Sequence, residues 1–297
     1  MIGPVVCAGI VVMDLIFEVP ALPSAATKYF ATSCREVAGG IAGNAALAVA
    51  RLGGAARLVS RVGADGPGRA LRAILESGGV DCRFLEEGPG ATSTSAVCLD
   101  PTGERMLVNH VDPAIFDGPL PAAAFEGAAA VMCDLRWPEG ASCALEAARA
   151  AGIPGVLDFD ISPEDGLALL PVASHVIFGE AALRNASGRD DLNEGLEALA
   201  QAHPDVAFAV TAGAAGAHWL FRGECGHIPA LPVAAVDTLG AGDVYHGAAA
   251  LALAEGADFA EALRFAGAAA AVKVSRPSGP DSFPTRSDIE NLMETTE

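Results

Sequence analysis

Residues 129–158, AAVMCDLRWPEGASCALEAARAAGIPGVLD, contain two short apolar runs with a longer stretch between them. The runs at 129–133 and 154–158 predict strands that are buried on both faces, because they are almost continuously apolar. The stretch at 139–151 predicts a helix. A strand, a helix and a second strand in this order are typical of a parallel sheet with helices packed on its faces.

The same alternation extends outward in both directions. Further strands are predicted at residues 4–12, 57–62, 174–178 and 206–211. Further helices are predicted at 41–52, 67–77, from 180 onward, 192–202, 241–254 and 259–274, so that the last third is mostly helical. This pattern predicts an α/β fold with a mostly parallel central sheet and helices on both of its faces.

Two segments, 16–37 and 92–110, interrupt the alternation with extended stretches and turn residues but no helix. We expect their extended parts, at 28–37, 93–99 and 104–109, to pair into a small antiparallel sheet that projects from the core as a lid. A pair of edge hairpins is the alternative. Since no linker is long enough to separate two domains, we expect one domain over residues 1–297 with these lid segments inserted.

Composition narrows the function classes. The chain has 297 residues, of which 52% are hydrophobic, and a net charge of −19, so it can bury a large core and would be repelled by nucleic acid and by anionic membranes. Its seven cysteines form no C-x-x-C pair, which is typical of a reduced, cytoplasmic protein. The sequence contains no run of 18 uncharged apolar residues, so it predicts no membrane span.

The most specific motif is Asp237-Thr-Leu-Gly-Ala-Gly-Asp243, which precedes an apolar helix. A Gly-Ala-Gly turn at the start of a helix leaves backbone N–H groups unpaired beside the positive end of the helix dipole, which makes it an anion site. Asp243 is then placed to accept a proton from a substrate hydroxyl while the amides hold a phosphoryl group. The alternative is that Asp243 is an ordinary N-terminal cap.

Two weaker glycine-rich motifs accompany it. In the stretch Gly39-Gly-Ile-Ala-Gly-Asn44, paired glycines allow a polar ligand to approach the backbone, and Asn44 can both donate to and accept from hydroxyls. The stretch Thr211-Ala-Gly-Ala-Ala-Gly216 follows an apolar strand and predicts either a nucleotide-contacting loop or a tight turn. No G-x-G-x-x-G follows the first strand, so a dinucleotide site is disfavoured.

Together the three motifs resemble the ribokinase/PfkB family of carbohydrate kinases over nearly the whole chain. The resemblance implies a ribokinase-like three-layer sandwich with a small β lid, and transfer of the γ-phosphoryl group of ATP to a sugar hydroxyl, with Mg²⁺ and in many members a monovalent cation. It implies Asp243 as the base and an anion hole at Gly240, Ala241 and Gly242. It implies sugar contacts at Asp14, Gly39, Gly40 and Asn44, and nucleotide contacts at Thr211, Gly213 and Gly216.

One departure concerns the metal. The family's N-x-x-E motif helps to hold the metal and its water shell, and here Glu180 is present but the Asn position is Ile177. Of this motif only Glu180 is left as the implied metal-site residue. The alternative is that Glu180 is an ordinary acidic residue at a helix start. Lys273 and Arg276 resemble the family segment near the adenine and cation site. His246 is expected to be a helix residue near the site rather than a catalyst.

Four stretches are similar to the sulfofructose kinase branch: residues 12–23, 103–109, 134–137 and 157–163. That resemblance implies phosphorylation of the 1-hydroxyl of 6-deoxy-6-sulfofructose, with the sulfonate held by Lys28 on a lid strand, Asn109 and Arg136. A Lys, an Arg and an amide would suit an anionic substrate in a chain of charge −19. The alternatives are a solvated Lys28, and an Arg136 paired with Asp134 or Glu139.

The substrate and assembly stay open at this point. Asn44 in the Gly-Gly motif resembles ketohexokinases and ribokinases as much as it resembles the sulfofructose enzymes, so a neutral ketose such as fructose is an alternative substrate. Because sulfonate and phosphate carry similar oxygens, fructose 6-phosphate and tagatose 6-phosphate are further alternatives. The rival outside the kinases is a sugar- or nucleotide-binding regulator that has lost catalysis, although an intact Gly-Ala-Gly-Asp argues against it. Because lids in this family often pair between subunits, a homodimer through the lid is expected. The partners are therefore ATP and a small sugar.

Overall fold

The computed structural model describes residues 2–118, 120–160 and 164–295. Within these residues the central sheet has nine strands in the order β13-β12-β11-β10-β9-β8-β1-β4-β5. They are β1 (Val5–Ala8), β4 (Ala56–Gly63), β5 (Asp81–Gly88), β8 (Ala130–Asp134), β9 (Gly155–Phe159), β10 (His175–Gly179), β11 (Ala207–Thr211), β12 (Ala217–Phe221) and β13 (Glu224–Ile228). Neighbouring strands from β5 to β11 pair in parallel, and β12 and β13 add an antiparallel edge. The predicted mostly parallel sheet is confirmed.

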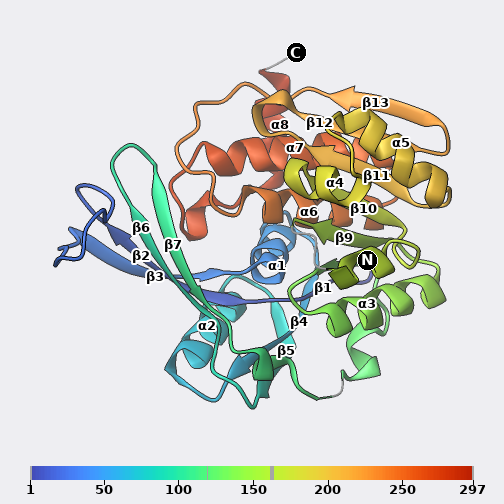
Figure 1. Ribbon diagram of the computed structural model, residues 1–297. Helices are drawn as coiled ribbons and strands as arrows, with labels where there is room; N and C mark the ends of the chain where they lie inside the picture. The colour runs from blue at the N-terminus through green and yellow to red at the C-terminus, as the bar shows by residue number, and fades with distance from the viewer. Residues whose placement is uncertain (1, 119, 161–163, 296–297) are drawn as a thin grey trace.

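Helices cover both faces of this sheet (Figure 1). They are α1 (Ile41–Arg51), α2 (Gly66–Ser77), α3 (Pro138–Ala151), α4 (Glu180–Ser187), α5 (Leu192–Ala202), α6 (Ala241–Ala254), α7 (Phe259–Val274) and α8 (Arg286–Glu294). Short 3₁₀ helices lie at Pro113–Phe116, Ala122–Phe125, Glu164–Leu169, Gly213–Ala215 and Pro280–Ser282. One apolar cluster joins the sheet to α1, α2, α6 and α7, and a second joins it to α3, α4 and α5.

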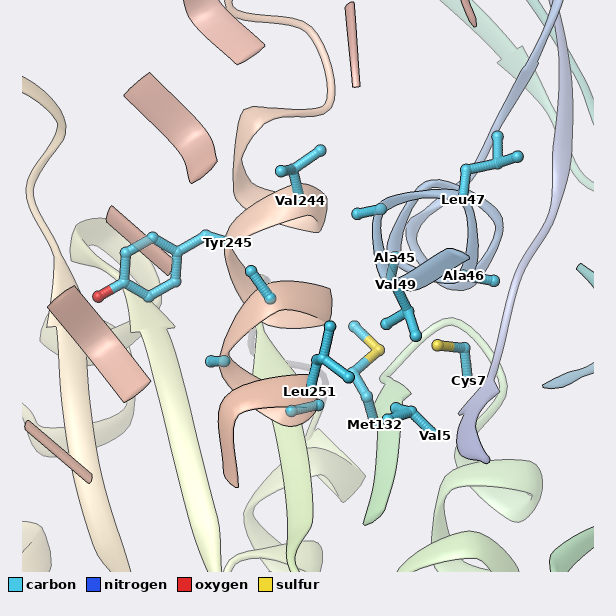
Figure 2. Packing of buried hydrophobic residues seen from close by; sticks show 14 of the residues in the cluster. Val5, Cys7, Ala45, Ala46, Leu47, Val49, Met132, Val244, Tyr245 and Leu251 are labelled. Carbon is cyan, nitrogen blue, oxygen red and sulfur yellow. The ribbon is translucent and has the colours of Figure 1, made fainter. Parts of the chain in front are cut away.

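The strands contribute to both clusters in alternation. In β1, Val5 and Cys7 pack in the first cluster, whereas Val6 and Ala8 pack in the second. All four are almost fully buried, which explains why β1 is continuously apolar. In the first cluster, Figure 2 shows α1 and α6 side by side above the sheet, with Val49 and Leu251 near the strand residue Met132.

A second sheet carries the expected lid. Its strands, in the order β3-β2-β6-β7, are β2 (Val12–Glu18), β3 (Ser33–Gly39), β6 (Thr94–Leu99) and β7 (Arg105–His110). This lid sheet projects from the body of the molecule (Figure 1). Its outer pairs, β2 with β3 and β6 with β7, are antiparallel, but the central pair of β2 with β6 is parallel. The prediction of a wholly antiparallel lid is therefore wrong at its centre.

The predicted strand over 4–12 is confirmed at Val5–Ala8 but wrong beyond it, because the chain leaves the central sheet at Gly9 and β2 begins at Val12. At Gly9 the backbone has φ 152°, and an added Cβ would lie 1.9 Å from an Asp134 carboxylate oxygen. The same carboxylate accepts the Ile10 N–H at 2.9 Å, so the chain turns out of the central sheet here and continues into the lid. Asp134 is fully buried and is the residue that holds this turn.

Several elements were not predicted. The strand β5, the hairpin β12–β13 and the helix α8 lie in stretches that we had left unassigned or expected to be mostly helical. All seven cysteines are free thiols. Among the described residues, no helix combines the length and the apolar content needed to cross a membrane.

Candidate active site

The turn at residues 237–243, called the signature turn below, leads directly into α6. Gly240 precedes the helix with φ 74°, a left-handed conformation that favours glycine. An added Cβ at Gly240 would lie 3.1 Å from the Asn44 amide nitrogen, whereas at Gly242 it would meet nothing within 4 Å. The turn is therefore open at its tip. The first amides of a helix have no intrahelical acceptor, which makes this turn an anion site beside the helix dipole.

The amides differ from one another. The Ala241 N–H donates to the Thr238 carbonyl at 3.3 Å, which engages one of the three residues expected to form the anion hole. Gly242 is the residue of the turn that faces open space, whereas Gly240 lies against Asn44. Asp243 is the third residue of α6 and forms no side-chain cap hydrogen bond at the helix start. The alternative that Asp243 is an N-terminal cap is wrong.

The Asp243 carboxylate instead contacts a residue from the second glycine-rich motif. Its Oδ2 accepts a hydrogen bond from Nδ2 of Asn44, on α1, at 2.7 Å. Burial raises the pKa of Asp243 from its ordinary value, and the Asn44 hydrogen bond and the nearby His246 lower it in part. A carboxylate whose pKa is raised toward neutrality is a better proton acceptor for an alcohol than a fully solvated one.

Asp14 lies close to Asp243, at the base of the lid. It is buried, and burial first and the Asp243 charge second raise the pKa of Asp14 to about 7. The glycine pair makes room for it, because an added Cβ at Gly39 would lie 2.1 Å from an Asp14 carboxylate oxygen. At Gly40, φ is 82° and a Cβ would lie 2.6 Å from the Ile10 carbonyl oxygen. Asp14 and Asn44 line a pocket of about 340 Å³ that Leu239 and Lys273 also line.

The lid adds a polar row beside Asp14. Ser95 on β6 pairs with Asp14 on one side and with Asn109 on the other, so the three side chains share one face of the lid sheet. Ser95 is 2% exposed, and its hydroxyl oxygen is buried without a hydrogen-bond partner among the described residues. Asn109 is exposed. The register therefore places Asn109 in line with Asp14, and it adds Ser95, which sequence analysis missed because a lone Ser carries no distinctive signal.

The two cations expected to bind a sulfonate lie differently. The Arg136 side chain donates through Nη2 to Asp160 at 2.5 Å, and not to Asp134 or Glu139. Only the backbone N–H of Arg136 donates to the Asp134 carboxylate, at 2.8 Å. Lys28 is exposed in the loop between β2 and β3, not on a lid strand as predicted. The reason lies in Tyr29, whose hydroxyl accepts the Ser24 and Ala25 N–H groups at 2.9 Å and thus curls this loop.

Comparison with known proteins shows the family of this chain. A model for the pfkB family of carbohydrate kinases matches residues 4–286. The chain belongs to the pfkB family of carbohydrate kinases. A fructokinase from Klebsiella pneumoniae is 34% identical over 228 residues, which cover 70% of this chain and 74% of the relative. A ribokinase from Bacillus subtilis is 30% identical and covers 95% of this chain and 96% of its own.

Solved structures agree. A candidate ribokinase from Agrobacterium tumefaciens is 34% identical and aligns with a TM-score of 0.95 over 99% of this chain and 98% of that chain. A ribokinase from Arabidopsis thaliana, solved with ribose and ATP, is 26% identical, with a TM-score of 0.86 over 99% of each chain. The protein is therefore an ATP-dependent sugar kinase with a ribokinase-like fold.

The expected nucleotide loop of this pfkB kinase lies at the end of β11. The Thr211 hydroxyl donates to the Phe178 carbonyl at 3.3 Å. An added Cβ at Gly213 would meet nothing within 4 Å, so this residue faces open space. Gly216 has φ 91°, and a Cβ there would lie 2.1 Å from the Ile228 carbonyl oxygen. Close packing against β13 is therefore sufficient to explain the glycine at 216. Gly213 has no such neighbour and leaves room for a ligand.

The acidic residue expected at the metal site of the kinase opens α4. Glu180 pairs with Arg184 one helical turn later, at 3.1 Å, and is partly exposed. Ile177, at the position where the family has Asn, is fully buried in β10. Among the described residues, no group of three or more His, Cys, Asp or Glu side chains could hold a metal ion.

His246 of the kinase is buried behind the signature turn. Its Nδ1 lies 2.7 Å from the Gly242 carbonyl oxygen and 3.1 Å from Asp158, and its Nε2 lies 3.2 Å from the Ile177 carbonyl oxygen. These contacts join the first turn of α6 to β9 and β10. They agree with the expectation that His246 supports the site without reaching the reacting atoms.

Proposed function

We propose that this kinase transfers the γ-phosphoryl group of ATP to the 1-hydroxyl of 6-deoxy-6-sulfofructose. The observation that carries the chemical part is the placement of the Asp243 carboxylate beside the open amides of the signature turn and within 2.7 Å of Asn44. Asp14, Asn44, Gly39 and Gly40 would hold the sugar hydroxyls in the pocket that Asp14 and Asn44 line. Thr211, Gly213 and Gly216 would lie along the nucleotide.

The reaction needs one proton acceptor and one anion site. The sugar hydroxyl gives its proton to the Asp243 carboxylate while its oxygen forms a bond to the γ-phosphorus. The bond from the γ-phosphorus to the β,γ-bridging oxygen breaks, and ADP leaves. The Gly240 and Gly242 amides hold the phosphoryl oxygens, and the Ala241 amide joins them once its N–H leaves the Thr238 carbonyl. Positioning with charge stabilisation supplies most of the acceleration in such transfers.

Mg²⁺ fits this site as a companion of ATP. It usually binds through one or two carboxylates together with substrate phosphates and water, and Glu180 can supply one such carboxylate once Arg184 releases it. The ion would neutralise charge on the transferring phosphates. A monovalent cation has less support, because the Lys273 ammonium already lies near the Asp237 and Asp243 carboxylates.

The support for an anionic ketose is the Asn109 amide, in line with Ser95 and Asp14 on the lid sheet, together with the Arg136 guanidinium. Asp160 forms an ion pair with Arg136. Asp160 is also close enough to Asp243 for its negative charge to raise the pKa of Asp243. Arg136 is therefore near the base. A sulfonate would compete with Asp160 for the guanidinium, and planar guanidinium groups suit oxyanions.

The test is a kinase assay with ATP and Mg²⁺ that compares 6-deoxy-6-sulfofructose, fructose 6-phosphate, tagatose 6-phosphate and fructose. We expect the highest kcat/KM for sulfofructose. The double variant Lys28→Ala, Arg136→Ala should raise KM for sulfofructose by about 100-fold, because two charge-assisted contacts are lost, and for fructose by less than about threefold. Arg189→Ala, an exposed Arg between α4 and α5, is the matched control and should change neither value.

A neutral ketose is the second candidate, and two observations favour it. Arg136 is already paired with Asp160, and Lys28 does not line the pocket that contains Asp14 and Asn44. Equal effects of the double variant on sulfofructose and fructose would favour this candidate. Failure to phosphorylate any sugar in the panel, despite sugar binding, would favour the non-catalytic regulator instead.

We also propose a homodimer that forms through the lid. The support is a group of large apolar side chains that are exposed on or beside the lid sheet: Phe30 (80%), Val108 (65%), Val111 (42%) and Leu107 (41%). Leu107 and Val108 are consecutive on β7, so each face of the lid sheet exposes one of them. Large exposed apolar side chains on a projecting sheet mark a surface that binds another protein. Sedimentation velocity should show a dimer that Val108→Glu converts to a monomer, and a monomeric native protein would contradict the proposal.

A further inference from the structure

Lys273 is a buried cation that the proposed mechanism does not yet use. It lies in the last turn of α7, is 3% exposed, and its ammonium nitrogen has no hydrogen-bond partner among the described residues. Buried polar atoms in native proteins are nearly always hydrogen-bonded, and a lysine ammonium has three protons to donate. Lys273 also lines the pocket that contains Asp14 and Asn44. This combination indicates a partner that enters the pocket from solution.

The backbone holds Lys273 against the signature turn. The carbonyl of the next residue, Val274, accepts the N–H groups of Val236 at 2.7 Å and of Asp237 at 3.1 Å. Asp237 is engaged elsewhere, because its two carboxylate oxygens accept the Leu239 N–H at 2.9 Å and the Ser278 N–H at 3.0 Å. The Lys273 ammonium therefore lies close to the signature turn without being neutralised by a direct ion pair.

A second cation reaches the same turn from the lid. Arg105, the first residue of β7, donates through Nη1 to the Thr238 hydroxyl at 2.9 Å. The hairpin before it is also close, since a Cβ added at Gly103 would lie 3.8 Å from the Val236 carbonyl oxygen. Arg105 is near enough to Lys273 to lower its pKa, while burial lowers that pKa more strongly and Asp237 opposes both.

The charges around the turn require such cations. Asp14 and Asp243 lie in the site, and Asp160 lies close enough to Asp243 to raise its pKa. The terminal phosphoryl group of ATP would add further negative charge, whereas the dipole of α6 supplies only about half an elementary charge. Amides and the dipole alone would therefore leave strong repulsion between the phosphoryl group and these carboxylates.

We propose that Lys273 and Arg105 together bind the γ-phosphoryl group as it is transferred at the signature turn. Lys273 is the fixed member on α7. Arg105 is the member that arrives with the lid and exchanges the Thr238 hydroxyl for a phosphoryl oxygen, so that the anion site is complete only with the lid against the turn. This inference rests on the proposed site of phosphoryl transfer, and it adds two residues that would touch the transferred group.

The experiment compares Lys273→Met and Arg105→Gln with Arg264→Gln, which removes an exposed charge from the same helix α7 as Lys273. Calorimetry measures the affinity for ADP and for a non-hydrolysable ATP analogue that retains a γ-phosphoryl group. Lys273→Met should weaken the analogue by about tenfold or more and leave ADP within about twofold. It should lower kcat by about 100-fold, as expected for the loss of one donor to developing charge. Arg105→Gln should show the same pattern at about tenfold, and Arg264→Gln none.

Thermal unfolding separates this role from a structural one. Removal of a buried, unpaired ammonium should leave the Tm of Lys273→Met equal to or above that of the native protein. A kcat within threefold of native, or an equal loss of ADP and analogue affinity, would overturn the inference. If the native enzyme phosphorylates no sugar in the panel, the proposed function fails, but the difference between analogue and ADP binding still tests Lys273 and Arg105.

Discussion

Asp243→Asn is expected to lower kcat by about 10³-fold, because it removes the group that accepts the proton of the sugar hydroxyl, and general base catalysis contributes about 10²- to 10⁴-fold. The variant should keep its structure. An Asn side chain at 243 can offer its carbonyl oxygen to Nδ2 of Asn44, which preserves the 2.7 Å contact that the carboxylate makes. KM for the sugar should therefore change by less than about fivefold. Steady-state kinetics with the preferred ketose and saturating ATP measures both quantities.

Asp258→Asn is the matched control, since it makes the same chemical change at another helix start. Asp258 caps α7 by accepting the Glu261 N–H at 2.8 Å, and Asn caps helices as well as Asp does. It should leave kcat and KM unchanged. A kcat for Asp243→Asn within tenfold of the native value would show that another group accepts the proton.

The pH profile gives a second readout of the same prediction. Burial raises the pKa of Asp243 from its ordinary value, so the native kcat/KM should fall on the acid side at a higher pH than a solvated aspartate would cause. Asp14, with a pKa raised to about 7, should contribute to the same limb as it loses its charge. Asp243→Asn should remove the contribution of Asp243 and move that of Asp14 to lower pH, because the Asp243 charge helps to raise the pKa of Asp14.

Local sequence patterns were sufficient to predict the elements that have a clear apolar periodicity or a continuous apolar run. The helices at 241–254 and 259–274 end where apolar periodicity and turn residues indicate, and the parallel sheet follows from continuously apolar strands. The break at Gly9 could not be predicted, because it depends on a carboxylate from Asp134, 125 residues later in the chain. The edge strands β12 and β13 carry few buried residues and thus little pattern.

The site divides in the same way. Asp243 and Asn44 lie on motifs whose glycines and helix starts can be read locally, and their contact confirms that the two motifs meet. Lys28 was assigned to a strand because residues 28–37 are extended in pattern, whereas the Tyr29 hydroxyl holds the preceding loop in a curl. The roles of Ser95 and Arg105 could not be predicted from the sequence. Ser95 is placed by the register of the lid strands, and Arg105 by the contact of the lid with Thr238, and neither is a local property of the sequence.

Gly247→Ala is expected to destabilise the protein by about 2 kcal/mol and to lower kcat by about tenfold, although Ala is the better helix former. Gly247 lies in the middle of α6, where α6 crosses α1. An added Cβ would lie 2.6 Å from the Ala45 carbonyl oxygen and 2.9 Å from its Cα. Because both atoms belong to the backbone of α1, neither can rotate away, and the two helices must separate.

That separation connects packing to catalysis. Asn44 is the residue before Ala45 on α1, and its Nδ2 must stay within hydrogen-bond distance of Asp243 on α6. Gly267→Ala, in the interior of α7, is the matched control, since its Cβ would meet only the Tyr245 ring at 3.9 Å. It should stabilise the protein by about 0.5–1 kcal/mol through helix propensity and leave kcat unchanged. Urea unfolding and steady-state kinetics on both variants separate the outcomes: if Gly247→Ala loses stability but keeps native kcat, the α1–α6 spacing does not position the base.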